Sequence, residues 1–173
     1  MVIEGETMRR LWECQNWEEF INFNCRTGVR LRFENDVDPE VRRSCIQFVS
    51  WLRCEYEFPI RVPIYFKATE TIKTMNGGNA SASFFGPFDI SQEPYIRIAV
   101  GDYEYLLEQR GPDNALAAIL HSITHELSHY FQWIKYHEIW LKNNDSNIKY
   151  FERQAKYYAH EIVLDYAEIV DHP

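Results

Sequence analysis

Hydrophobic and polar positions follow two different periods along this chain. Some stretches alternate apolar and polar residues at every second position, which is typical of half-buried strands. Others repeat apolar residues every three or four positions, which is typical of amphipathic helices. The first period predicts strands at Val29–Phe33, Arg61–Lys67 and Tyr95–Val100. The order of the two kinds of stretch predicts an α+β fold.

The helical period is found before the first of these strands, between the first and the second, and after the last. A first helix is predicted over Met8–Phe23, and a second begins at Asp38-Pro39 and runs to about Tyr56. Asp is a good N-cap and Pro is favoured at the first helical position, so the start of the second helix is well defined. The expected packing residues of the first helix are Leu11, Trp12, Phe20 and Ile21.

A tight turn is predicted at Asn76-Gly77-Gly78-Asn79, between extended stretches at 71–75 and 80–85. Asn-Gly adopts the positive φ angles of a hairpin turn, so the two stretches are expected to pair antiparallel. The second arm carries small residues and is followed by Pro87, which cannot donate to a strand ladder, so we predict an edge strand. Such an edge either binds an extended peptide by strand addition or stays solvated.

The longest helix is predicted from Asn114 to about Trp140, after Gly111-Pro112-Asp113. Two histidines, His125 and His129, fall almost opposite its apolar stripe, next to small residues that leave room for a ligand. One face can therefore pack on the sheet while the other opens onto a cleft. The stripe consists of Leu116, Leu120, Ile123, Leu127, Phe131 and Ile134.

Composition limits the classes of protein that fit. With 173 residues, 46% of them hydrophobic, we expect one domain over residues 1–173, in which residues 1–55 form an N-terminal portion and residues 56–173 form the core. A net charge of −8 argues against nucleic acid or an anionic membrane as a partner. The N-terminal residues resemble no signal peptide and no apolar run is long enough to span a membrane, so we expect a cytoplasmic protein.

Four cysteines, at positions 14, 25, 45 and 54, do not follow the spacing of a zinc knuckle. Without an export signal we expect them to be reduced thiols. Cys45 lies in an apolar helical stretch and is expected to be buried.

The candidate chemistry is the pentapeptide His125-Glu126-Leu127-Ser128-His129, an HExxH sequence inside the long predicted helix. Residues four apart lie on one helical face, so both imidazoles can bind a single zinc ion. Glu126 points to one side, where it can act on a metal-activated water as the general base. His121 lies two turns before His129, which is too far to share the ion with it.

A catalytic zinc ion needs a third protein ligand. The next helix offers Glu152 and Glu161. Glu152 begins an apolar series with small residues at Ala155 and Ala159, so we expect it to be buried against the histidine helix and to bind the metal. Glu161 is expected to face solvent, although the spacing Glu161-Ile162-Val163-Leu164-Asp165 keeps it as an alternative.

With these residues in place, the chain resembles the gluzincin peptidases, in particular the minimal ImmA/IrrE-type metallopeptidases. The resemblance rests on the HExxH pentapeptide and on the segment Glu152–Glu161, which is similar to the family's ExxAxxxAxE helix. It covers roughly residues 60–170. It implies a small zincin-like domain, in which a mostly antiparallel sheet of three or four strands packs against the HExxH helix. It also implies one Zn²⁺ held by His125, His129 and Glu152. Two departures are Ser128, where the family usually has Gly, and the lack of an acidic residue four positions after Glu152.

The predicted activity is zinc-dependent hydrolysis of a peptide or protein substrate, with Glu126 carrying the proton. The residue that stabilises the oxyanion stays open among Tyr157, Tyr158 and His121. Two other classes of protein also fit the sequence. One is a non-catalytic zinc-binding module for regulation or interaction. The other is a structural protein in which the histidines lie at the surface. The sequence indicates neither the substrate, nor the oligomeric state, nor whether the N-terminal portion covers the cleft.

Overall fold

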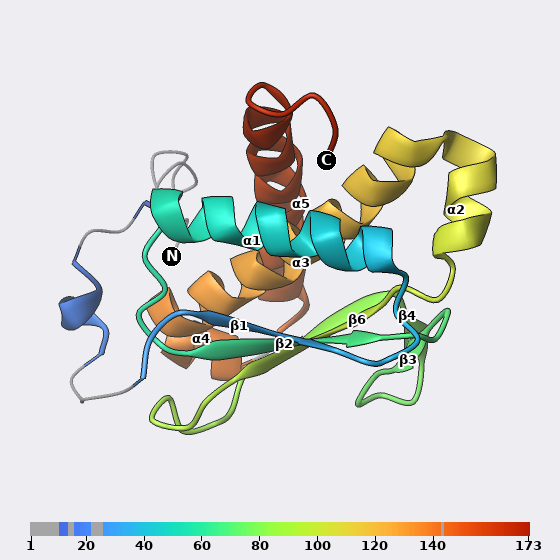
Figure 1. The fold of residues 1–173 in the computed structure, drawn as a ribbon. Helices are drawn as coiled ribbons and strands as arrows, with labels where there is room; N and C mark the ends of the chain where they lie inside the picture. The colour runs from blue at the N-terminus through green and yellow to red at the C-terminus, as the bar shows by residue number, and fades with distance from the viewer. Residues whose placement is uncertain (1–10, 14–15, 22–25, 143) are drawn as a thin grey trace.

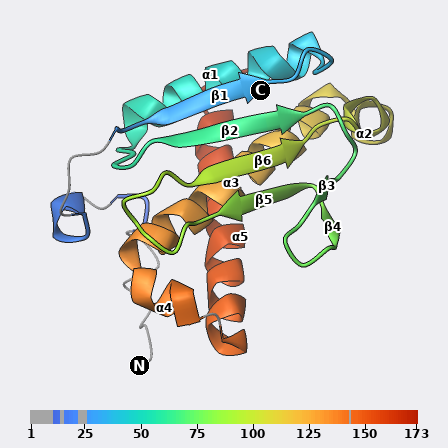
Figure 2. The same cartoon turned by 90° about the horizontal axis from the view of Figure 1, so that it is seen from below.

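The computed structural model describes residues 11–13, 16–21, 26–142 and 144–173. Helices α1 and α3 lie on one face of a four-stranded sheet, and α5 packs across α3 (Figures 1 and 2). The strands are β1 (Val29–Phe33), β2 (Val62–Lys67), β5 (Ala82–Phe85) and β6 (Tyr95–Ala99), and a two-stranded ribbon consists of β3 (Ile72–Lys73) and β4 (Asn79–Ala80). The helices are a 3-10 turn η2 (Trp17–Glu19), α1 (Pro39–Glu55), α2 (Tyr103–Arg110), α3 (Pro112–Lys135), α4 (His137–Lys142) and α5 (Asp145–Ala167).

The main sheet has the strand order β1-β2-β6-β5 and is largely parallel. The expectation of a mostly antiparallel sheet is therefore wrong, since only β5 runs antiparallel to its neighbour β6. The reason lies in the connections. Helix α1 carries the chain back across the sheet between β1 and β2, so both strands run in the same direction. The chain then moves to the far edge, forms β5 and turns back into β6, which leaves β6 parallel to β2.

The alternation of apolar and polar residues predicts correctly which side chains of strand β2 are buried. In β2, Val62, Ile64 and Phe66 are fully buried, while the residues between them are partly or well exposed. The α1 helix begins as predicted, because the Asp38 side chain accepts a hydrogen bond from the Glu40 amide at 2.7 Å. Its buried face includes Cys45, whose burial raises the pKa of the thiol and makes it unreactive.

The predicted helix over Met8–Phe23 is partly outside the described residues, and the part that is described does not form one helix. Only Trp17–Glu19 is helical there, as a single 3-10 turn. The cause is packing: the rings of Trp12 and Trp17 lie 4.8 and 5.3 Å from that of Phe131. Residues five apart on an α-helix point about 140° away from each other, so one helix could not place both rings on Phe131.

The predicted hairpin is confirmed for the residue pairs next to its turn and corrected farther from the turn. Ile72 pairs with Ala80 and Lys73 with Asn79, around a turn in which Gly77 has a φ of 79°. The second arm then leaves this ribbon at Ser81 and continues as β5, which joins the main sheet. As predicted, β5 is an edge strand.

Among the helices in the described part of the chain, none combines the length and apolarity needed to cross a bilayer.

Gly86, directly after β5, is packed against the long helix. A Cβ atom at this position would lie 2.5 Å from Cδ1 of Trp133. Trp133 cannot move aside, because it is fully buried and its indole donates a hydrogen bond to the Pro87 carbonyl at 3.0 Å. The absence of a side chain at Gly86 thus keeps the end of β5 next to α3.

We expect Gly86→Ala to lower the free energy of unfolding by about 1–3 kcal/mol, the usual cost of forcing an extra carbon into a packed site. Gly78→Ala is the matched control, because the added Cβ there meets only the Thr74 hydroxyl at 3.4 Å. Urea denaturation of the two variants measures the difference. Equal midpoints would show that Gly86 is not tightly packed.

Candidate metal centre

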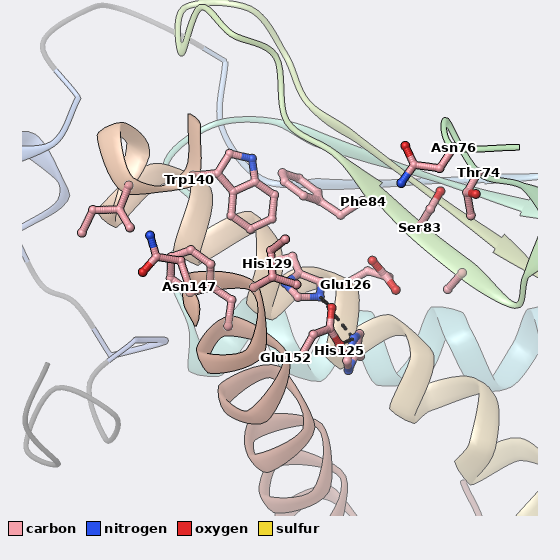
Figure 3. A pocket seen from close by; sticks show the side chains of 14 residues that line it. Thr74, Asn76, Ser83, Phe84, His125, Glu126, His129, Trp140, Asn147 and Glu152 are labelled. Atoms are coloured by element: carbon pink, nitrogen blue, oxygen red, sulfur yellow. Dashed lines mark hydrogen bonds and ion pairs between the residues drawn. The ribbon is translucent and has the colours of Figure 1, made fainter. Parts of the chain in front are cut away.

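Helices α3 and α5 bring the candidate ligands together. The apolar stripe of α3 is buried as predicted, which fixes the rotation of the helix. On α5, Ala155 and Ala159 are buried and small, so the two helices can approach closely. Figure 3 shows His125 and His129 on α3 with the Glu152 carboxylate from α5 beside both rings.

The three side chains offer one donor atom each within a small space. Nε2 of His129 lies 3.2 Å from Nε2 of His125. Oε2 of Glu152 lies 3.4 Å from Nε2 of His125, and Oε1 lies 3.3 Å from Nε2 of His129. Among the described residues, this is the group of three His, Cys, Asp or Glu side chains that offers one ligand atom each within 4.8 Å of one another.

The separation of the two histidine nitrogens suits a zinc ion. Zinc binds nitrogen and oxygen at about 2.0–2.2 Å with tetrahedral angles, so neighbouring donors lie about 3.3 Å apart. The 3.2 Å between the two histidine nitrogens agrees with this value, and each Glu152 oxygen lies at a similar distance from one of these nitrogens. With one donor atom taken from each residue, the three atoms lie within 4.8 Å of one another. The group could therefore hold one metal ion without a large movement of its side chains.

The tautomer of His129 follows from a buried glutamine, Gln132, on the next turn of α3. The Gln132 amide nitrogen donates to the Phe151 carbonyl at 2.9 Å, and a carbonyl can only accept. This fixes the amide orientation and turns its oxygen towards Nδ1 of His129, at 2.8 Å. Nδ1 must then carry the proton of the neutral ring. Nε2 is left with a lone pair that faces the metal site.

The lone pair of His129 and the Glu152 carboxylate require a cation between them, either a metal ion or a proton on the ring. Hydrogen bonding to His125, and then to His129, holds the pKa of Glu152 far below its ordinary value. Burial works to lower the pKa of His129, but the Glu152 and Glu126 carboxylates raise it above its ordinary value. The electrostatics of the site thus favour a bound positive charge.

Glu152 differs from the expectation in one respect, because 46% of its side chain is exposed rather than buried. It lies at the rim of a cavity of about 510 Å³, which keeps the carboxylate accessible from solvent. The apolar series that follows Glu152 on α5 is buried as predicted. Glu161 is exposed, as expected, and is not part of the three-residue group.

Glu126 is almost fully buried and lies beside the three candidate ligands without belonging to the group. Burial raises the pKa of its carboxyl above the ordinary value, while the neighbouring His129 and His125 rings and the backbone amide of Phe84 oppose that rise. A carboxylate whose pKa is raised towards neutrality is suited to accept and return a proton near pH 7. Figure 3 shows its oxygens directed into the cavity.

The aromatic residues near the site divide between core and cleft. Tyr130 and Trp133 are fully buried, and the Tyr130 hydroxyl donates to the Ile60 carbonyl at 2.6 Å. Trp140 instead lines the cavity.

The long helix ends at Lys135 instead of Trp140, because Tyr136 leaves the helical region with φ of −120° and ψ of 37°. The short helix α4 that follows places Trp140 over the site.

None of the three candidates for stabilising the oxyanion lines this first cavity. Tyr157 is exposed on α5 and does not line it. The Tyr158 hydroxyl accepts a hydrogen bond from the Leu11 amide at 3.0 Å, behind the site. His121 lines a neighbouring cavity that shares His125 and Glu126 with the first.

Ser128, which departs from the family pattern, has a structural role. Its hydroxyl accepts a hydrogen bond from the Trp12 indole at 3.0 Å and donates one to the Thr124 carbonyl at 2.8 Å.

The described N-terminal residues line neither of the two cavities beside the metal group, which consists of His125, His129 and Glu152. They pack against the core and attach to the buried side of α3.

The sequence interpretation missed Gln132. Its position three residues after His129, on the same helical face, is the signal that could have identified it. Its neighbour across the helix interface, Gln154, accepts a second hydrogen bond from the same amide at 2.9 Å.

We expect Gln132→Leu to weaken zinc binding by about 10–100-fold, because the ring of His129 loses the acceptor that orients it. Gln154→Leu is the matched control, because Gln132 keeps its bond to the Phe151 carbonyl and its oxygen on Nδ1, so zinc binding should stay within a few-fold of that of the unmodified protein. Competition with a chromophoric chelator measures both affinities. If Gln132→Leu and the unmodified protein bind zinc equally, the glutamine does not orient the ligand.

No protein-family model matches the chain, and no curated protein or solved structure shows a significant similarity to it. The resemblance to gluzincins therefore rests on the HExxH pentapeptide, the Glu152 helix and the geometry described above.

Proposed function

We propose that this protein is a zinc-dependent metallopeptidase that hydrolyses peptide bonds. The observation that carries the proposal is the convergence of His125, His129 and Glu152, with one donor atom of each within 4.8 Å of the others, and with the buried Glu126 beside them and open to the same cavity. When bound there, zinc would supply a Lewis acid that lowers the pKa of a coordinated water towards neutrality and polarises the substrate carbonyl.

Each side chain has a separate task in this proposal. Two imidazoles and the Glu152 carboxylate would hold the metal at the wall of the cavity that Glu126 also lines. Glu126 takes the proton of the attacking water and passes it to the leaving nitrogen. A zinc module that only binds its partner would have no need for a carboxyl group whose pKa is raised by burial at this position.

The strand β5 supports a peptide as the substrate. Within the described part of the chain, β5 has a strand partner on one side only, and its other edge runs beside the metal group. An extended peptide can add to such an edge through backbone hydrogen bonds. Ser83 and Phe84 of β5 line the cavity, so the added peptide would cross the metal centre.

Removing the metal tests the proposal. We expect a purified, zinc-loaded sample to cleave members of a peptide library and to lose this activity after dialysis against a chelator. One equivalent of Zn²⁺ should restore the activity, while Mg²⁺ should not, because the nitrogen-rich ligand set suits zinc. Cleavage that continues at full rate in a sample verified to be free of metal would contradict the proposal.

A further inference from the structure

The metal centre lies between two cavities of similar size. The first, of about 510 Å³, contains the three ligands. The second, of about 490 Å³, shares His125, Glu126 and Ala82 with the first. A substrate whose reacting bond lies at the shared wall therefore places neighbouring residues in both cavities.

The two cavities differ in chemistry. Beside the candidate ligands, Glu126 and neutral polar residues, the first is lined by large apolar side chains, of which Phe84 and Trp140 are visible at its wall in Figure 3. The second is lined by His121, Lys156 and His160, together with two serine hydroxyls. The rings of His121 and His160 lie 6.2 Å apart and are stacked. Glu126 is the one carboxylate among the lining residues of the second cavity.

This basic lining is unusual for the chain as a whole, which has 26 acidic residues and 18 lysines and arginines. Lys156 is exposed and offers its ammonium group to the cavity. The pKa of His121 is lowered by burial and by the nearby His160, so at neutral pH its ring is a neutral hydrogen-bond donor. Cations and N–H donors in one concave site are the groups that recognise a carboxylate.

We infer that the second cavity binds a carboxylate of the substrate, while the first takes a large apolar side chain on the other side of the cleaved bond. This inference rests on the proposed peptidase function and deepens it by naming a substrate class. The carboxylate can belong to an aspartate or glutamate side chain or to the C-terminus of the peptide. Both sources offer the same chemistry to Lys156.

The direction of β5 decides which side of the bond carries the acid. Ser81, just before β5, lines the second cavity, and Phe84 lines the first, so the strand runs from the basic cavity to the apolar one. A peptide that adds antiparallel, the more stable arrangement per residue, runs the opposite way. Its apolar residue is therefore N-terminal to the cleaved bond, and its carboxylate is C-terminal to it.

Binding can be measured apart from turnover with zinc-loaded Glu126→Gln protein, which keeps the ligands. The probes are four fluorescent peptides with a central phenylalanine, followed by glutamate or glutamine and ending in a free or an amidated C-terminus. Fluorescence anisotropy should show about five- to tenfold tighter binding for a peptide with the recognised carboxylate than for its neutral counterpart. The glutamate pair and the C-terminal pair distinguish the two sources.

The same peptides are then measured with Lys156→Glu added, and with Arg30→Glu as the matched control. Arg30 is exposed on β1, at the opposite edge of the sheet, so its replacement gives the same charge change far from the cavity. We expect the preference to disappear with Lys156→Glu and to remain with Arg30→Glu.

The inference is overturned if the acidic and neutral peptides bind equally, if none of them binds, or if the preference survives Lys156→Glu. Failure of the proposed function has a different signature. In that case the carboxylate preference is present, but zinc-loaded protein with Glu126 intact cleaves none of the peptides.

Discussion

Glu126→Gln should lower the rate of peptide cleavage by about 10²–10⁴-fold, the usual contribution of a positioned acid or base, while one zinc ion stays bound. Glutamine has nearly the same shape as glutamate but cannot accept the proton of the attacking water. Glu126 is not among the three proposed metal ligands, so metal binding should be unaffected. Replacing this buried carboxyl by an uncharged amide should also leave the fold intact.

The measurement combines initial cleavage rates with elemental analysis of the same samples. Bound zinc with lost activity is the expected pair of results, and it separates loss of the base from loss of the metal. Undiminished cleavage by Glu126→Gln would remove Glu126 from its proposed role. Loss of zinc together with activity would mean that Glu126 supports the metal site itself.

Glu152→Gln should have the second large effect, on metal binding. The apparent free energy of zinc binding to structural sites such as zinc fingers is about 10–16 kcal/mol. The loss of one of three protein ligands is therefore expected to weaken zinc binding by about 10²–10³-fold. In the structure the Glu152 carboxylate lies 3.3 and 3.4 Å from the two imidazoles, and it is the only anionic member of the group.

Glu161→Gln is the matched control, because it makes the same change on the same helix. Glu161 is exposed and lies outside the metal group, so its replacement should leave zinc stoichiometry and activity unchanged. Elemental analysis after gel filtration compares the two variants directly. If only Glu161→Gln releases zinc, the assignment of the third ligand is wrong.

Helical periodicity made the metal group predictable from the sequence. Four-residue spacing places His125 and His129 on one face whatever the rest of the fold does. The apolar series after Glu152 indicates which side of α5 meets α3, and the small residues Ala155 and Ala159 indicate that the helices are close. These features are local, and the structure preserves them.

Features that depend on connections between distant segments were not predictable. The direction of β6 depends on where the chain turns after β5, and alternation of residues contains no information on direction. The N-terminal segment is shaped by Trp12 and Trp17 packing on Phe131, more than a hundred residues away. Gln132 gains its role only when α5 supplies the Phe151 carbonyl.

A crystal structure of the zinc-loaded protein, with data collected at the zinc absorption edge, tests the central claim most directly. We predict one anomalous peak, about 2.0–2.2 Å from Nε2 of His125, Nε2 of His129 and a carboxylate oxygen of Glu152. The claim is contradicted if these three side chains point apart with no peak between them, or if the zinc is held by other residues.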